Sequence, residues 1–136
     1  MNREELHEQL QKDIVDSKAL IEKLKHEPLM DDDGYPTDAC LDIIQTWHWS
    51  DSVGWFKFIK EHWYYVDWGW KEVDEPHDFK KDNMVHRYYI STGGWSGNEG
   101  IIRAMQANEM MWNFNWLQSR RGGHYIFEDY QFKVED

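Results

Sequence analysis

The sequence WNFNWLQSRRGGHYIF occupies residues 112–127 and decides the fold class of this chain. Aromatic and polar residues alternate over residues 112–117, a pattern typical of a strand with one buried face. The two glycines of RRGG supply the positive φ angles that a tight hairpin turn needs. Residues 124–127 are rich in aromatic and β-branched residues, as expected of a partner strand. This segment therefore predicts an antiparallel hairpin with its tip at residues 120–123.

A second glycine-rich segment, STGGWSGNE, lies upstream at residues 91–99. Ser96 followed three residues later by Glu99 fits a capping box, so we expect Ser96 to cap a helix. Residues 86–91 predict a strand that leads into this segment. Residues 63–73 are also rich in aromatic residues and predict a strand, broken at Gly69.

Residues 3–26 predict an amphipathic helix that Asn2 caps and Pro28 stops. Its less polar stripe has a four-three-four-three spacing and consists of Leu10, Ile14, Ser17, Ile21 and Leu24. The stripe has two interpretations, a helix packed on its own domain or a helix for self-association.

Two shorter helices are expected next, one capped by Thr37 and ending near residue 47, the other capped by Ser50 or Asp51. The chain is therefore expected to be a single α+β domain over residues 1–136, with residues 1–28 as its N-terminal helix. The expected architecture is N-terminal helices followed by a small, mostly antiparallel sheet with one packed helix.

The charge balance limits the classes of partner. The 136 residues include 15 Lys and Arg against 26 Asp and Glu, a net charge of −11. General nucleic-acid binding and an anionic membrane surface are disfavoured, because both need a basic face. The single cysteine forms no intrachain disulfide, and no apolar leader or span is visible, which is typical of a soluble intracellular protein.

No motif indicates a metal site or a cofactor. The DDDG run at residues 31–34 lacks the alternating ligands of a calcium loop, and the seven histidines are spread along the chain. No nucleophile or metalloprotease motif is present. We expect a non-enzymatic protein, and a hydrolase that uses His124 is the remaining enzymatic interpretation.

The two glycine-rich segments are the candidate ligand site. A helix entrance offers free N–H groups, arginines bind phosphate or carboxylate, and tryptophans stack on flat rings. Alone, each segment is also explained as a turn or a helix cap, so the hypothesis requires that they converge. The residues expected to bind the ligand are Gly94, Trp95, Ser96, Gly97, Asn98, Trp112, Trp116, Arg120, Arg121, Gly122, Gly123 and His124.

These segments also carry a resemblance. GGWSGNE at residues 93–99, WNFNW at 112–116 and QSRRGGHYIF at 118–127 resemble a family of small, poorly characterised proteins of tailed bacteriophages. The resemblance covers roughly residues 85–128, and RRGGHY is its most specific element. It implies a viral protein in the cytoplasm of an infected bacterium, and it assigns no activity to individual residues.

The resemblance and the candidate site lead to one functional hypothesis and one alternative. The hypothesis is that the protein binds a small phosphorylated or nucleotide-like ligand, and so sequesters an immune signalling nucleotide of the host. The alternative is an inhibitor that docks on a host defence protein through an acidic, aromatic surface, with the N-terminal helix forming an oligomer.

Overall fold

The structure, a computed structural model, describes residues 1–135 and has the expected α+β order. The helices are α1 (Arg3–Leu24), α2 (Asp38–Thr46), α3 (Ser52–Glu61), α4 (Val66–Gly69), α5 (Ser96–Ala107) and α6 (Glu109–Asn115). The strands are β1 (Trp70–Pro76), β2 (Met84–Ser91), β3 (Trp116–Arg120) and β4 (His124–Asp129). They form one antiparallel sheet in the order β1-β2-β4-β3.

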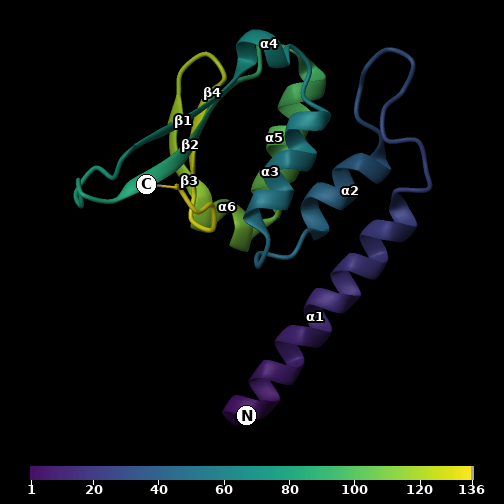
Figure 1. The fold of residues 1–136 in the computed structure, drawn as a ribbon. Helices are drawn as coiled ribbons and strands as arrows, with labels where there is room; N and C mark the ends of the chain where they lie inside the picture. Colours follow the sequence, from purple (N-terminus) through teal and green to yellow (C-terminus); the bar gives the residue numbers. More distant parts are fainter. Residues whose placement is uncertain (136) are drawn as a thin grey trace.

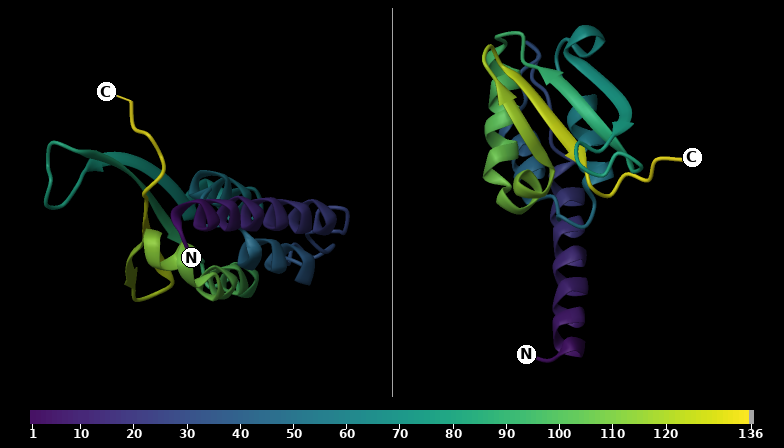
Figure 2. Two further views of the ribbon diagram at one scale, coloured as in Figure 1. Left: turned by 90° about the horizontal axis from the view of Figure 1, so that it is seen from below. Right: turned by 90° about the vertical axis from the view of Figure 1, so that its left-hand side faces the viewer.

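The helices gather on one face of this sheet, and the other face is open (Figure 1). The core lies between them, where the Phe56 ring of α3 stacks on Tyr88 with 4.1 Å between centroids and packs on Phe127 at 5.5 Å. Phe56 and Phe127 are fully buried. Each such side chain contributes about 1.5–3 kcal/mol of apolar burial. In the right-hand view of Figure 2, the open face of the sheet is turned toward the viewer.

The helix caps agree with the sequence at three of four positions. Asn2, Thr37 and Asp51 accept from the backbone N–H groups of Glu5, Cys40 and Gly54. The predicted capping box at Ser96 was wrong, because Trp95 is the N-cap residue and Ser96 is already helical. The Ser96 hydroxyl instead donates to the Tyr35 hydroxyl at 3.3 Å.

Two predicted strands were partly wrong. Residues 109–115 form α6, and the strand begins only at Trp116. Met111 and Asn115 are four residues apart and both buried. A helix places both side chains on the face that packs against the core, whereas a strand with alternating faces would also bring the residue midway between them to that face. Residues 66–69 likewise form α4 rather than strand. The backbone turns there, since Tyr65 has a φ of 65° and its carbonyl accepts from the Gly69 N–H at 2.7 Å.

The stripe of α1 packs on its own chain. The five residues named for the stripe are the ones in α1 that are buried or half-buried. The polar member is also explained, because the Ser17 hydroxyl donates to the Thr46 carbonyl at the end of α2, at 2.9 Å. The first turns of α1 project away from the body, and Leu6 is 57% exposed (Figures 1 and 2). Self-association through this end stays a prediction.

Within the described chain, none of the helices combines the length and the apolar character needed to cross a lipid bilayer.

Candidate functional site

The two glycine-rich segments meet at one end of the sheet. Ser91 and His124 are cross-strand partners, with 2.6 Å between Ser91 Oγ and His124 Nδ1. The Thr92 N–H donates to the Gly123 carbonyl at 3.0 Å, and Thr92 Oγ1 accepts from the Gly94 N–H at 3.3 Å. Thr92 is 1% exposed, and its hydrogen bonds to Gly123 and Gly94 connect the hairpin tip to the helix entrance.

Gly123 makes this junction possible. Its φ is +80°, and a Cβ there would lie 2.3 Å from Thr92 Oγ1. Gly122 has a φ of +91°, yet its Cβ would meet His124 Nε2 at an ordinary 3.4 Å. Both glycines therefore need a positive φ angle, but only Gly123 lacks space for a Cβ atom.

We expect Gly123→Ala to lower the free energy of unfolding by about 2–3 kcal/mol and Gly122→Ala by about 1–2 kcal/mol. Denaturant unfolding of both variants measures the difference. Because only the first substitution pushes Thr92 away, it alone should shift the NMR signals of Ser91 and Thr92. Equal losses and unchanged signals in both variants would contradict a tight junction.

The open face carries a cationic end beside this junction. Arg120 pairs with His124 across the hairpin, and Lys71 pairs with Tyr89 in the next row. Cross-strand partners share a face, so these side chains lie on the same side of the sheet. A hollow of about 310 Å³ is lined there by Tyr89, Ile90, Ser91, Arg120, His124, Tyr125 and Ile126.

The Arg120 side chain is oriented by one hydrogen bond. Its Nε donates to Gln118 Oε1 at 2.8 Å, which fixes the plane of the guanidinium group. No acceptor in the described residues engages its terminal nitrogens, and these form the fork that suits phosphate or carboxylate. Arg121 is exposed at the hairpin tip.

The predicted tryptophans do not belong to this hollow. Trp116 Nε1 donates to Ser119 Oγ at 2.9 Å, and Ser119 pairs with Tyr125, whose ring packs against the core. Trp112 contacts Phe127 on that side too, at 5.2 Å between centroids. Both tryptophans therefore lie on the face opposite Arg120, so the structure does not bring them to the hollow as the sequence predicted.

Residues 95–98, in the second half of the glycine-rich segment 91–99, also lie away from the hollow. Asn98 is 1% exposed and bonds the backbone N–H and carbonyl of Tyr64 at 2.9 and 2.8 Å, so it is a structural clamp. Trp95 lies between the rings of Tyr35 and Tyr64, and its buried Nε1 has no hydrogen-bond partner in the described chain. Gly97 lies beneath the Trp95 indole, where a Cβ would approach Nε1 to 2.5 Å. Of the predicted site residues, only Arg120 and His124 line the hollow, together with Ser91. Gly94, residues 95–98, Arg121, Gly122 and Gly123 do not line it.

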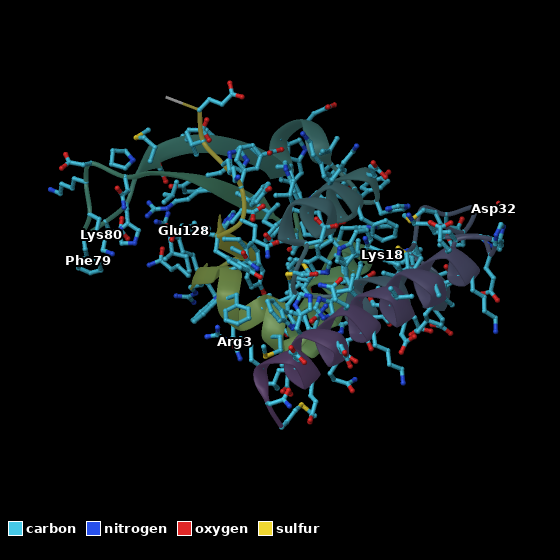
Figure 3. All side chains as sticks on the ribbon, turned by 60° about the horizontal axis from the view of Figure 1, so that its bottom comes forward. Arg3, Lys18, Asp32, Phe79, Lys80 and Glu128 are labelled. Carbon is cyan, nitrogen blue, oxygen red and sulfur yellow. The ribbon has the colours of Figure 1, made fainter. Side chains whose placement is uncertain are left out.

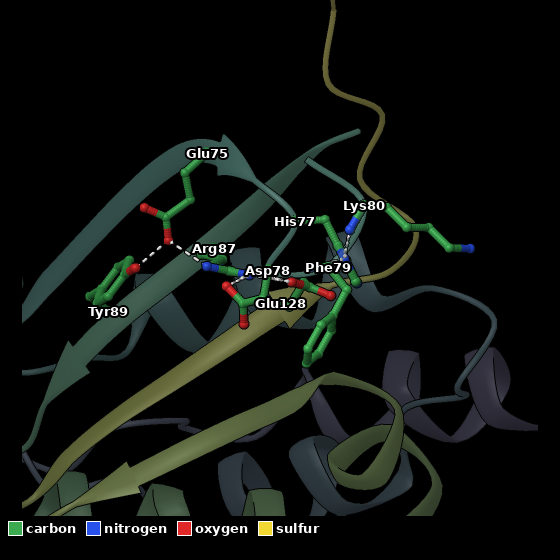
Figure 4. A network of polar contacts seen from close by, with 8 residues as sticks. All are labelled: Glu75, His77, Asp78, Phe79, Lys80, Arg87, Tyr89 and Glu128. Atoms are coloured by element: carbon green, nitrogen blue, oxygen red, sulfur yellow. Dashed lines mark hydrogen bonds and ion pairs between the residues drawn. The ribbon is translucent and has the colours of Figure 1, made fainter. Parts of the chain in front are cut away.

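A buried arginine on the open face was missed by the sequence analysis. Arg87 is 7% exposed and donates to Glu75, Asp78 and Glu128 at 3.0–3.1 Å (Figure 4). Burial by itself lowers the pKa of this guanidinium, but the three acidic partners outweigh burial and hold it above its ordinary value. The Tyr89 hydroxyl also donates to Glu75, which ties the network to the hollow.

The sequence contained a weak indication of the ion pairs around Arg87, namely acidic residues in β1 and in the loop after it. Glu75 lies in the polar part of β1, and Asp78 lies in the loop that follows. Only the register, in which Arg87 pairs with Val73 and Glu128, brings the acidic side chains around it. A sequence without strand pairing does not give that register.

The single cysteine is not a candidate for chemistry. Burial raises the pKa of the Cys40 thiol to about 12, so this side chain is a poor nucleophile. Among the described residues, no three or more His, Cys, Asp or Glu side chains are grouped to hold a metal ion.

Comparisons with protein-family models, curated proteins and solved structures found no match for this chain.

Proposed function

We propose that the protein binds a small phosphorylated or nucleotide-like ligand, without converting it, at the cationic end of the open sheet face. The observation that carries the proposal is the junction of the two glycine-rich segments beside Arg120. Arg120 and His124 lie on one cross-strand row with Ser91, and Lys71 lies on the neighbouring row with Tyr89.

Each group has a defined part in this proposal. Arg120, with Arg121 and Lys71 nearby, holds the anionic group. His124 engages Ser91 through Nδ1 and lines the hollow beside Arg120. The Tyr89 ring, which lines the hollow, provides a flat surface for a base. Trp112 and Trp116, on the other face, have no part.

Local charge supports the choice of an anion. The protein carries a net charge of −11, so a cluster of basic side chains on one end of a face is the exception. The acidic groups of this face, Glu75, Asp78 and Glu128, are engaged by Arg87. In a phage protein, the role we propose is sequestration of an immune signalling nucleotide of the host.

The test is isothermal calorimetry and thermal shift against cyclic dinucleotides, cyclic mononucleotides and linear nucleotides. A ligand present at 100 times its Kd should stabilise the protein by about 2.7 kcal/mol. Arg120→Ala with Arg121→Ala should remove this effect and leave the fold intact. Arg3→Ala with Arg103→Ala is the matched control, because it removes two exposed arginines outside the hollow.

Two results would overturn the proposal. One is the absence of stabilisation by every compound at millimolar concentration. The other is an equal loss of binding in the control variant, which would indicate general electrostatics. Chromatography of the released ligand completes the test, because a chemically changed ligand would indicate an enzyme instead.

A further inference from the structure

Five aromatic side chains form a continuous, partly exposed row beside the helix entrance, with stacked or tilted neighbours except at Tyr64 and Tyr65, which meet edge to face at 79°. The members of this aromatic ladder are Trp68, Tyr65, Tyr64, Trp95 and Tyr35 in spatial order. Successive ring centroids are 5.1, 4.4, 4.9 and 4.5 Å apart. The exposed fractions are 61% for Trp68, 42% for Tyr65 and Tyr64, and 37% for Tyr35. Aromatic rings usually bury most of their area, so a row of partly exposed rings indicates a binding surface.

The ladder is assembled from three distant segments by specific contacts. Asn98 clamps the backbone of Tyr64. Gly93 lies against the Trp68 end, where a Cβ would approach the indole to 2.5 Å. Tyr65 adopts a φ of 65°, which costs about 1 kcal/mol for a residue other than glycine. Strained and clamped backbone that serves to expose rings is typical of a binding surface.

The segments that build the ladder carry charge of one sign. Residues 29–37, 63–69 and 92–100 contain Asp31, Asp32, Asp33, Asp67 and Glu99, and they contain no lysine or arginine. Asp67 is adjacent to Trp68 at one end of the ladder, and the aspartate run precedes Tyr35 at the other. All five carboxylates belong to exposed residues. The charged partner that fits this surface is a cation.

We propose that the aromatic ladder is a docking surface for an arginine-bearing basic segment of a partner protein. Guanidinium groups stack on the free ring faces at the ladder ends, Trp68 and Tyr35, and pair with the neighbouring carboxylates. The tyrosine hydroxyls along the middle accept or donate hydrogen bonds to the backbone of the segment. Tyr, Trp and a charged rim are the composition of protein interfaces, and the carboxylates repel nucleic acid.

This surface is separate from the proposed ligand site. The ladder consists of residues from α4 and from the loops before α2, α4 and α5, whereas the hollow lies on the open sheet face. The two adjoin near Thr92, where Gly93 lies against Trp68 and the Asn98 clamp donates to the Thr92 carbonyl. Either proposal can therefore fail while the other stands.

The test compares fluorescently labelled nonapeptides of arginine, of lysine and of glutamate by anisotropy at 150 mM salt. An acidic protein attracts any polycation, so the preference for arginine over lysine is the informative quantity. We expect the arginine peptide to bind about tenfold more tightly than the lysine peptide, because guanidinium stacks on two ring faces. The glutamate peptide should not bind.

Substitutions at the ladder ends test whether the preference for arginine arises there. Trp68→Ala with Tyr35→Ala should reduce the preference to about twofold or less, because both stacking faces are lost. Phe79→Ala with Phe114→Ala is the matched control, since these rings are 91% and 48% exposed outside the ladder. Phe79 lies on the opposite side of the molecule from Asp32 (Figure 3). Equal affinity for the arginine and lysine peptides, or a preference that survives loss of both ladder ends, would overturn the proposal.

Discussion

Asn98→Ala is expected to lower the free energy of unfolding by about 3 kcal/mol and to loosen the aromatic ladder. The side chain is 1% exposed and forms three hydrogen bonds, two to the backbone of Tyr64 and one to the Thr92 carbonyl at 3.3 Å. Alanine leaves the Tyr64 N–H and carbonyl without their partners, while the Thr92 carbonyl keeps the Trp95 N–H as a donor. Urea unfolding measures the loss, and near-ultraviolet circular dichroism reports the ordering of the rings.

Asn108→Ala is the matched control for this prediction. Asn108 is 8% exposed and donates to the carbonyls of Ile44 and Trp47 at 3.0 and 2.9 Å. Its loss should also destabilise the fold, by about 2 kcal/mol, since the Trp47 carbonyl loses its side-chain donor and the Ile44 carbonyl keeps only that of the Trp55 indole. Only Asn98→Ala should reduce binding of the arginine peptide. If both variants reduced it equally, the clamp would have no specific role in the ladder.

Arg87→Met is expected to cost about 2–3 kcal/mol, or roughly 10 °C in Tm. The arginine holds Glu75, Asp78 and Glu128 together on the open face, and methionine leaves three carboxylates without their counter-charge. Removing one partner of a buried ion pair typically costs about 3–5 kcal/mol. The loss is smaller here, because the side chains of the acidic partners keep 24–56% exposure and water can reach them.

A second substitution tests the physical reason for that loss. Glu75→Gln in the Arg87→Met background should recover about 1 kcal/mol, because it removes one of the three repelling charges. In the wild-type background the same substitution should destabilise. Arg103→Met, at an exposed position of α5, should change the free energy of unfolding by less than about 0.5 kcal/mol. A double variant no more stable than Arg87→Met would show that packing, rather than charge, accounts for the effect.

Prediction from the sequence was most successful where local physics decides. The caps at Asn2, Thr37 and Asp51, and the hairpin with its glycine tip, need only a few neighbouring residues. It failed at residues 66–69 and 112–115, where aromatic-rich segments have similar strand and helix tendencies. There the packing of Met111 and the clamp of Asn98 on Tyr64 override local preference.

The candidate site divides in the same way. The sequence singled out two glycine-rich segments, and the structure brings them into contact at Thr92. That they form one ligand site stays a prediction, because residues 93–99 do not line the hollow beside Arg120. The sequence did not indicate which side chains share a face. Arg120 and His124 lie on the open face, while Trp112 and Trp116 lie on the other.

The sequence by itself determined the α+β class, the net charge, the hairpin and the stripe of α1, because composition, turn glycines and periodicity are local quantities. The tertiary structure alone decided the register of the sheet, the burial of Arg87 among three carboxylates and the assembly of the aromatic ladder. These features join residues far apart in the chain. A shift of one residue in strand pairing would move each side chain to the opposite face, so no local pattern contains them.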